Sequence, residues 1–291
     1  MLRRPVCTVT LALLLGATIL GGIAGCATPA ATELPDDISV SVYQSRSDAS
    51  AGLIDVRIVN GSSDPLVLIE ARLETTQYAE PATWSRGTTL RAGATVDLRL
   101  ELPTPVCPTP TDAEPLVTLA FETPDGREGM ARFVADDPIG TLTKLSEQDC
   151  IAFEVGRVAV VEPASTLEWA PGEGEPALLD ITVTPTGSAG TLEIMRANQT
   201  VLLALADEAG GVVTSAPLDI RVTAGSAPAV LPLRLVPNRC DPHAVAEDKR
   251  GTFFPLEVRT SGGANGVLYV PVSDEVRGQI YEFVGDYCGF E

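Results

Sequence analysis

The sequence predicts an all-β protein built from two tandem sandwich domains, and three observations support this fold class. Apolar residues alternate with polar ones over short stretches, as in antiparallel strands that have one face in water. Clusters of Gly, Pro, Asn and Ser separate these stretches, and the pattern of strands, turns and cysteines repeats once along the chain. With 291 residues, 45% of them hydrophobic, the chain is long enough to form two cores.

The first 25 residues have the organisation of an export signal. Arg3 and Arg4 precede an apolar run that extends from about Val9 to Ile23. A run of about 15 residues is short for a permanent membrane-spanning helix, which needs about 20. We therefore expect residues 1–25 to be a cleavable signal peptide, with an uncut amino-terminal anchor as the alternative.

The end of the apolar run, Ile23-Ala24-Gly25-Cys26, resembles the lipobox of bacterial lipoproteins. The resemblance implies cleavage before Cys26, acylation of that cysteine with chains such as palmitate, and anchoring on the extracytoplasmic side of the cell membrane. Residues 26–36, rich in Ala, Thr and Pro, then form the lipid anchor and a tether.

The mature chain is strongly acidic. The net charge of the full sequence is −19, and it becomes −21 once Arg3 and Arg4 are removed with the signal peptide. Such a charge repels nucleic acids and anionic lipid headgroups, so we exclude nucleic-acid binding and charge-driven binding to membranes. The membrane contact that we expect is through the amino-terminal lipid.

An internal repeat sets the domain boundaries. Each copy has an early strand, a second strand, and a third alternating strand that ends at a proline shortly before a cysteine. We expect one domain over residues 37–152 and the other over residues 153–291. The matching stretches are Ile38–Val42 with Val158–Val161, Leu53–Ile58 with Leu178–Val183, and Leu98–Pro103 with Leu233–Pro237.

The number of strands points to a specific architecture. Seven or so short strands in a unit of about 120 residues are typical of an immunoglobulin-like β-sandwich. The sequence departs from the antibody pattern because Trp84 and Trp169 both precede the cysteines of their copies. The likeness is therefore one of architecture only.

Each copy closes on a short helix and carries one disulfide. Cys7 leaves with the signal peptide and Cys26 is committed to lipid, so four cysteines remain, and an even number in an exported chain predicts disulfides. The repeat favours pairing within each copy, which gives Cys107–Cys150 and Cys240–Cys288. Apolar residues at helical spacing predict the helix before each second cysteine; they are Ile139, Leu142 and Leu145 in the first copy, and Val276, Ile280 and Phe283 in the second.

The sequence offers little catalytic chemistry. A serine hydrolase needs a histidine as base, yet the chain has only His243 and no Gly-x-Ser-x-Gly motif. The cysteines are single and distant, unlike the pairs that bind structural zinc. Phosphate-binding glycine motifs are absent. Adjacent acids such as Asp136-Asp137 fit a solvated surface, with loop calcium as the alternative. We expect neither an enzyme, a cofactor nor a metal site.

One segment, residues 240–252, stands out because the second copy carries four extra residues there. It brings Asp241 and the sole histidine, His243, close in sequence to Lys249 and Arg250. As a recognition loop, it would offer donors to a carboxylate or phosphate. As an ordinary surface loop, its charges would pair with one another. The segment also resembles one in uncharacterised secreted proteins of actinobacteria, which implies no activity.

Trp84 is a second candidate contact residue. It lies in a turn-rich stretch, residues 79–87, that lacks strand alternation. Two interpretations are open: an exposed contact residue, or a core residue under a loop.

These observations favour a non-enzymatic lipoprotein of the cell envelope, which binds or scaffolds another envelope or secreted protein. Two alternatives are a ligand-binding accessory lipoprotein of a transporter and a carboxylate-dependent envelope hydrolase. The fold class by itself does not choose among them, because sandwiches host unrelated functions.

Overall fold

The computed structural model describes residues 34, 37–111, 114–170, 172, 174–246, 248 and 252–289. The predicted signal peptide, the lipidation site Cys26 and all of the tether except Leu34 lie outside these residues. Within them, the structure confirms an all-β chain with two sandwiches, each packed around its own apolar core. No helix among the described residues is long and apolar enough to cross a membrane.

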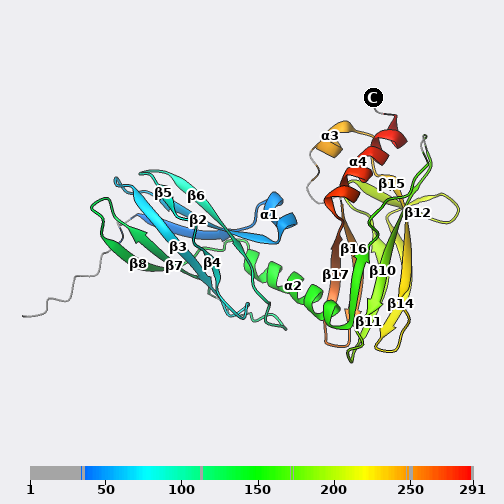
Figure 1. Ribbon diagram of the computed structural model, residues 1–291, viewed down its shortest axis with the longest axis horizontal. Coiled ribbons are helices and arrows are strands. Elements are labelled where there is room, and N and C mark those ends of the chain that lie inside the picture. The colour runs from blue at the N-terminus through cyan, green and yellow to red at the C-terminus, as the bar shows by residue number, and fades with distance from the viewer. Residues whose placement is uncertain are drawn as a thin grey trace, which may run out of the picture. The chain divides into compact units, whose positions relative to one another are not determined.

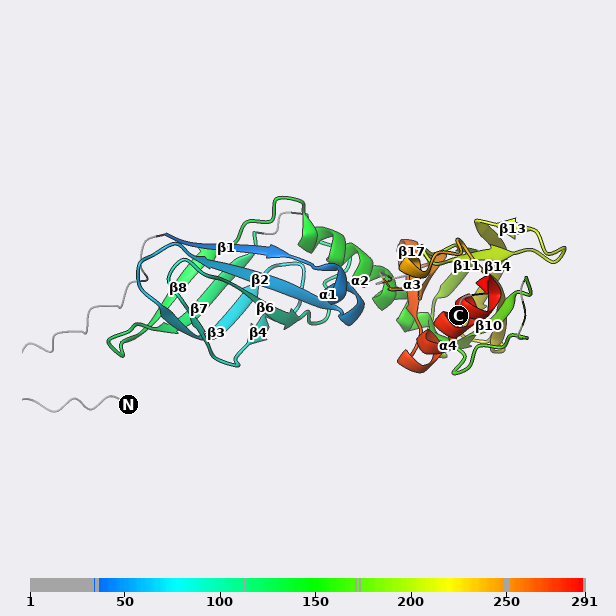
Figure 2. The same cartoon turned by 90° about the horizontal axis from the view of Figure 1, so that it is seen from above.

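The first sandwich has two antiparallel sheets, with the strand orders β1-β2-β6 and β4-β3-β7-β8; β5 also pairs with β3. The inward side chains of both sheets alternate with polar outward ones and form one core. Figure 2 shows β1 beside β2, with the short helix α1 where the two strands connect. The elements are β1 (Ile38–Tyr43), α1 (Arg46–Ala51), β2 (Leu53–Asn60), β3 (Leu66–Glu74), β4 (Ala82–Trp84), β5 (Thr88–Leu90), β6 (Thr95–Glu101), β7 (Leu116–Glu122) and β8 (Glu128–Val134).

The second sandwich also has two antiparallel sheets, in the orders β13-β12-β15-β10-β9 and β14-β11-β16-β17. The helices α3 and α4 pack together at one end of it (Figure 1). The strands are β9 (Ala159–Pro163), β10 (Ala177–Pro185), β11 (Thr191–Asn198), β12 (Leu203–Ala206), β13 (Val212–Val213), β14 (Ser215–Thr223), β15 (Ala229–Pro237), β16 (Phe253–Thr260) and β17 (Asn265–Pro271). The helices are α3 (Pro242–Ala246) and α4 (Asp274–Cys288).

Both predicted disulfides are present. Cys107 bonds Cys150, and Cys240 bonds Cys288, across sequence separations of 43 and 48 residues. Each bridge joins a helix to the segment that follows the β6 or β15 strand, as the repeat predicts. In the chain-entropy model, closing loops of this length contributes about 4 kcal/mol each.

The helix of the first copy is longer than the short helix that the sequence predicted. Helix α2 runs over Thr141–Val158, so Cys150 lies in its middle rather than at its end. Ile139 precedes the helix and is 67% exposed, because the helix begins after Gly140, whose left-handed conformation serves as the N-cap.

The extra turns of α2 exist because they bury apolar side chains. Leu142, near the start of the helix, belongs to the first core, whereas Val155 and Val158 belong to the second. The expected boundary between residues 152 and 153 therefore falls inside a continuous helix. Helix α4 matches the prediction better, since its residues Val276, Ile280 and Phe283 are all buried.

Candidate functional site

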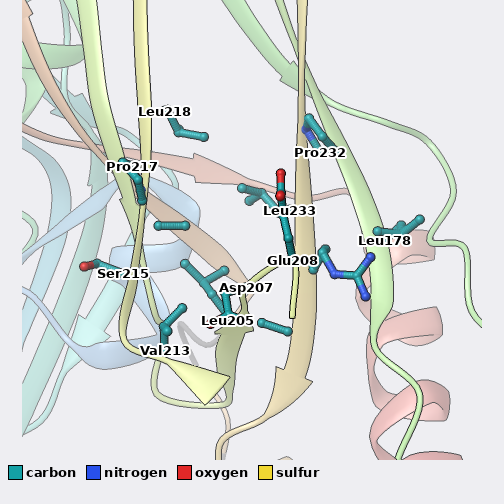
Figure 3. Close-up of a pocket in the computed structure, with 13 residues that line it drawn as sticks. Leu178, Leu205, Asp207, Glu208, Val213, Ser215, Pro217, Leu218, Pro232 and Leu233 are labelled. Carbon is teal, nitrogen blue, oxygen red and sulfur yellow. The ribbon is translucent and has the colours of Figure 1, made fainter. Parts of the chain in front are cut away.

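The second sandwich contains a cavity of about 660 Å³, which we call the β15 cavity. Figure 3 shows Ser215, Pro217 and Leu218 on one side of it, and Pro232 and Leu178 on the other. The β15 cavity is lined by Leu178, Leu205, Ala206, Asp207, Glu208, Val213, Ser215, Ala216, Pro217, Leu218, Pro232, Leu233 and Arg234.

The cavity exists because β12 separates from β15. The ladder between these strands ends at the Leu205–Leu235 pair. The next residue, Ala206, is the last of β12, and its ladder partner is Val212 of β13 on the other side of β12. From Ala229 to Arg234, β15 is therefore paired on its β10 side only, in the part of the chain that the structure describes. This divergence leaves a free strand edge beside the cavity.

The hairpin between β12 and β13 is held in place by Asp207. Its Oδ1 accepts a hydrogen bond from the Gly211 backbone N–H at 2.7 Å, and its own N–H donates to the Gly211 carbonyl at 2.9 Å. The Asp207 carboxylate is thus engaged by the turn. Glu208, next along the exposed tip, is left as the more available acid on this rim.

The opposite wall is β14, an edge strand that carries a β-bulge. Ile194 of β11 pairs with Ile220, but two residues further Arg196 pairs with Pro217, so β14 has one extra residue. Within the bulge, Asp219 adopts a left-handed φ of 50°. A bulge bends its strand and interrupts the ladder, which is common beside binding sites.

The cavity is apolar at its base and carries one cation. Leu205 and Leu233 are each only 2% exposed, and Leu218 is half-buried. Arg234 is the only basic residue in the lining, and its Nε is buried without a hydrogen-bond partner among the described residues. The lining thus offers apolar surface, one guanidinium and, on the rim, the carboxylates of Asp207 and Glu208.

The segment from Cys240 does not form this site. Asp241 and His243 lie at the start of α3, where the His243 side chain is 84% exposed and its Nδ1 lies 3.2 Å from Asp241 Oδ1. The His243 backbone N–H also donates to Asp241, and this bond lowers the pKa of that carboxyl. Neither residue lines the β15 cavity. The other two candidates, Lys249 and Arg250, lie outside the described residues.

Trp84 is a core residue, not an exposed contact. It ends strand β4, pairs with Ala71 of β3, and is only 8% exposed. The short strand was not apparent in the sequence because Pro81 and Gly87 dominate its surroundings. Of the two interpretations for Trp84, the structure supports the core one.

A second polar feature lies under α1 in the first sandwich. Asp48 of α1 and Asp55 of β2 are 4% and 1% exposed. Arg99 Nε lies 2.8 Å from Asp48 Oδ1 and 3.9 Å from Asp55 Oδ1. Burial, followed by the hydrogen bond and charge of Asp48, raises the pKa of Asp55 to about 6. Ser45 caps α1 and donates its hydroxyl to Asp48.

This carboxyl pair is enclosed, so it has the surroundings of a structural cluster. On the same sheet, Arg57 donates to Asp97 at 2.8 Å, and Tyr43 donates to Asp97 at 2.7 Å. The Arg57 guanidinium lowers the pKa of Asp97. Among the described residues, no group of three or more His, Cys, Asp or Glu side chains is placed to hold a metal ion.

The sequence did not reveal the β15 cavity, although one signal was available. Alternation around Leu233-Arg234-Leu235 predicted a strand but gave no information on its neighbours. Pro232 lies within that strand, and proline inside a strand marks a free edge or a bulge because it has no N–H to donate. Pro232 therefore indicated that the ladder on one side of this strand is incomplete.

Comparison with known proteins gives no family. No family model and no curated protein matches the chain. Solved structures match at low scores: red sea bream transglutaminase (TM-score 0.22, 11% identity, 81% of this chain and 31% of that one), and a biofilm-associated protein BSP domain (0.22, 10%, 80% and 57%). A third is a chaperone–tip adhesion subunit complex from Acinetobacter baumannii (0.18, 10%, 77% and 93%). The chain spans less than a third of the transglutaminase, and scores this low carry no functional argument.

Proposed function

We propose that this protein is a lipid-anchored extracytoplasmic lipoprotein that acts as a non-enzymatic binding module of the cell envelope, with the β15 cavity as its binding site. The observation that carries the proposal is the apolar cavity of about 660 Å³. Its volume lies within the range of about 300–1,000 Å³ in which proteins hold small molecules or small parts of a partner.

Two further features support an extracytoplasmic location. The lipobox-like sequence ends at Cys26 behind a short apolar run. Two disulfides staple the folded part, and such bonds persist in oxidising compartments outside the cytoplasm. A tether over residues 26–36 would hold the sandwiches beyond the lipid surface and give envelope components access to the cavity.

The cavity also gives specific support to one alternative, an accessory lipoprotein that passes a small ligand to a transporter. Its size and apolar base suit a soluble apolar ligand as well as a side chain of a protein partner. Both roles require the same first step, which is reversible binding at the β15 cavity.

Binding is tested with Nile red, a neutral dye whose fluorescence rises in apolar surroundings. We expect saturable binding to the full chain and its loss in Leu218→Glu, which places a charge on the half-buried cavity wall. The matched control is Val201→Glu, because Val201 is 74% exposed and does not line the cavity. Equal binding by both variants would remove the cavity from the proposal.

The anchor is tested separately by fractionating cells that express the native chain or Cys26→Ser. The native protein is expected in the membrane fraction with the added mass of acyl chains. The serine variant is expected to lose both the mass and the membrane association. Membrane retention of Cys26→Ser without acyl mass would instead indicate the uncut amino-terminal anchor.

A further inference from the structure

We propose that the ligand of the β15 cavity is a monoanionic amphiphile, an alkyl chain that ends in a carboxylate, and that Arg234 binds the carboxylate. This inference rests on the proposed function, since it names the ligand class of the same site.

Arg234 has no ion-pair partner among the described residues, and it differs from other unpaired arginines such as Arg86 and Arg239 because its Nε is buried without a hydrogen-bond partner in the lining of the cavity. On the other sheet of the same sandwich, Arg196 pairs with Glu257, while Arg221 and Arg259 both pair with Glu193. The chain has 39 acidic side chains for 20 basic ones, so partners are abundant. An arginine that is both unpaired and partly buried in a cavity wall is therefore informative.

The sheet register explains why Arg234 is unpaired. Its partner across the ladder on the β10 side is Leu178, which is apolar. On its other side β12 has already turned away, because the ladder ends at Leu205–Leu235. The guanidinium accordingly faces an apolar wall with its Nε buried. A buried donor without a partner costs free energy that an anionic ligand would recover.

The two walls argue against an extended peptide as the occupant. A peptide that adds to a strand edge needs backbone donors and acceptors in alternation. Pro232 on β15 and Pro217 on β14 both lack the N–H group, and proline is a common device against such pairing at strand edges. The surface that the cavity does offer consists of apolar side chains, which an alkyl chain fills without needing hydrogen bonds.

The charged residues that line the cavity, Arg234, Asp207 and Glu208, favour a ligand with a single negative charge. A guanidinium binds carboxylates and phosphates alike through parallel N–H bonds. The Asp207 and Glu208 carboxylates on the hairpin add negative charge close by, which penalises a dianion more than a monoanion. A carboxylate on an unbranched alkyl chain, as in a long-chain fatty acid, satisfies both the apolar base and this rim.

The test compares cis-parinaric acid, a fluorescent fatty acid, with its methyl ester, which has the same chain but no charge. The full mature chain carrying Cys26→Ser is used, because this change leaves every described residue intact. We expect the acid to bind about 10- to 100-fold more tightly than the ester, the range for a charge-assisted hydrogen bond. In Arg234→Gln, the affinity for the acid is expected to fall to that for the ester, with ester binding unchanged.

Ester binding reports that the variant cavity is still folded, and Arg259→Gln serves as the matched control because Arg259 lies on the other sheet. Equal affinities for acid and ester in the native protein, or an acid preference that survives Arg234→Gln, would overturn the inference and leave the binding module in place. Failure of both probes to bind would overturn the proposed function itself.

Discussion

The two sandwiches differ most in what they place against the outer face of the sheet that contains β6 or β15. In the first sandwich, Arg99 of β6 lies opposite Asp55 in the ladder and also pairs with Asp48 of α1. In the second, Arg234 of β15 lies opposite Leu178, and its buried Nε has no hydrogen-bond partner among the described residues. The same residue type thus closes a polar cluster in one domain and faces an apolar cavity in the other.

This difference arises because β15 is shifted along β10 relative to the matching pair β6 and β2, and because the helix α1 is found, among the described residues, only in the first sandwich. Asp55 and Asp180 occupy matching positions in the repeat, yet Asp55 pairs with Arg99 while Asp180 pairs with Pro232. In the first sandwich α1 also covers this region. The comparison teaches that, in a duplicated scaffold, the slip of one strand relative to its neighbour leaves a cation without the acidic partner that it has in the other copy.

The largest effect is expected from removing the disulfides, which tests whether the two stapled helices are equivalent. The double variants Cys107→Ser/Cys150→Ser and Cys240→Ser/Cys288→Ser should each lose about 4 kcal/mol of unfolding free energy in urea, because their loops have similar lengths. A loss below about 1 kcal/mol in either variant would show that native contacts, rather than the bond, fix that helix.

A smaller effect concerns the buried acid of the first sandwich. Because burial and Asp48 raise the pKa of Asp55 to about 6, the folded chain holds a proton that the unfolded chain releases near pH 4. The stabilisation of the fold by this proton on Asp55 is complete below pH 4 and is lost as the pH rises through about 6. We expect a loss of about 2 kcal/mol between pH 4 and pH 7.

Urea unfolding across that pH range measures this loss. In Asp55→Asn the Asp55-dependent part of the profile should disappear. Asp180→Asn, at the matching but exposed position of the second sandwich, should keep the native profile. If both variants retain the native slope, the acid dependence arises elsewhere and the contrast between the two faces is weaker than proposed.

The smallest effect tests the two arginines directly. Arg99→Leu leaves Asp48 and Asp55 without their cation and is expected to cost about 1 kcal/mol, since the Arg99 side chain is itself largely exposed. Arg234→Leu removes an unpartnered charge from an apolar wall, so its unfolding free energy should stay within about 0.5 kcal/mol of the native value or rise. A larger loss for Arg234 than for Arg99 would mean that Arg234 supports the fold rather than a ligand.

Much of the architecture was predictable because it depends on local patterns. Strand alternation located β1, β2, β10 and β15, and the repeat identified both disulfides without knowledge of the structure. The helices were predicted from apolar spacing, but the length of α2 was not. Its last turns are stabilised by Val155 and Val158 in the second core, a long-range contact that a local window does not contain.

The sequence by itself determined the fold class, the pairing of the cysteines and the shortage of catalytic side chains, because each follows from residue types and their spacing. Only the tertiary structure decided that Trp84 is buried, that Asp48 and Asp55 share one enclosed cluster, and that Arg234 lines an apolar cavity. The physical reason is that strand register and the point where a ladder ends depend on packing between segments far apart in the chain. A shift of two residues in that register determines whether an arginine meets an aspartate or a leucine.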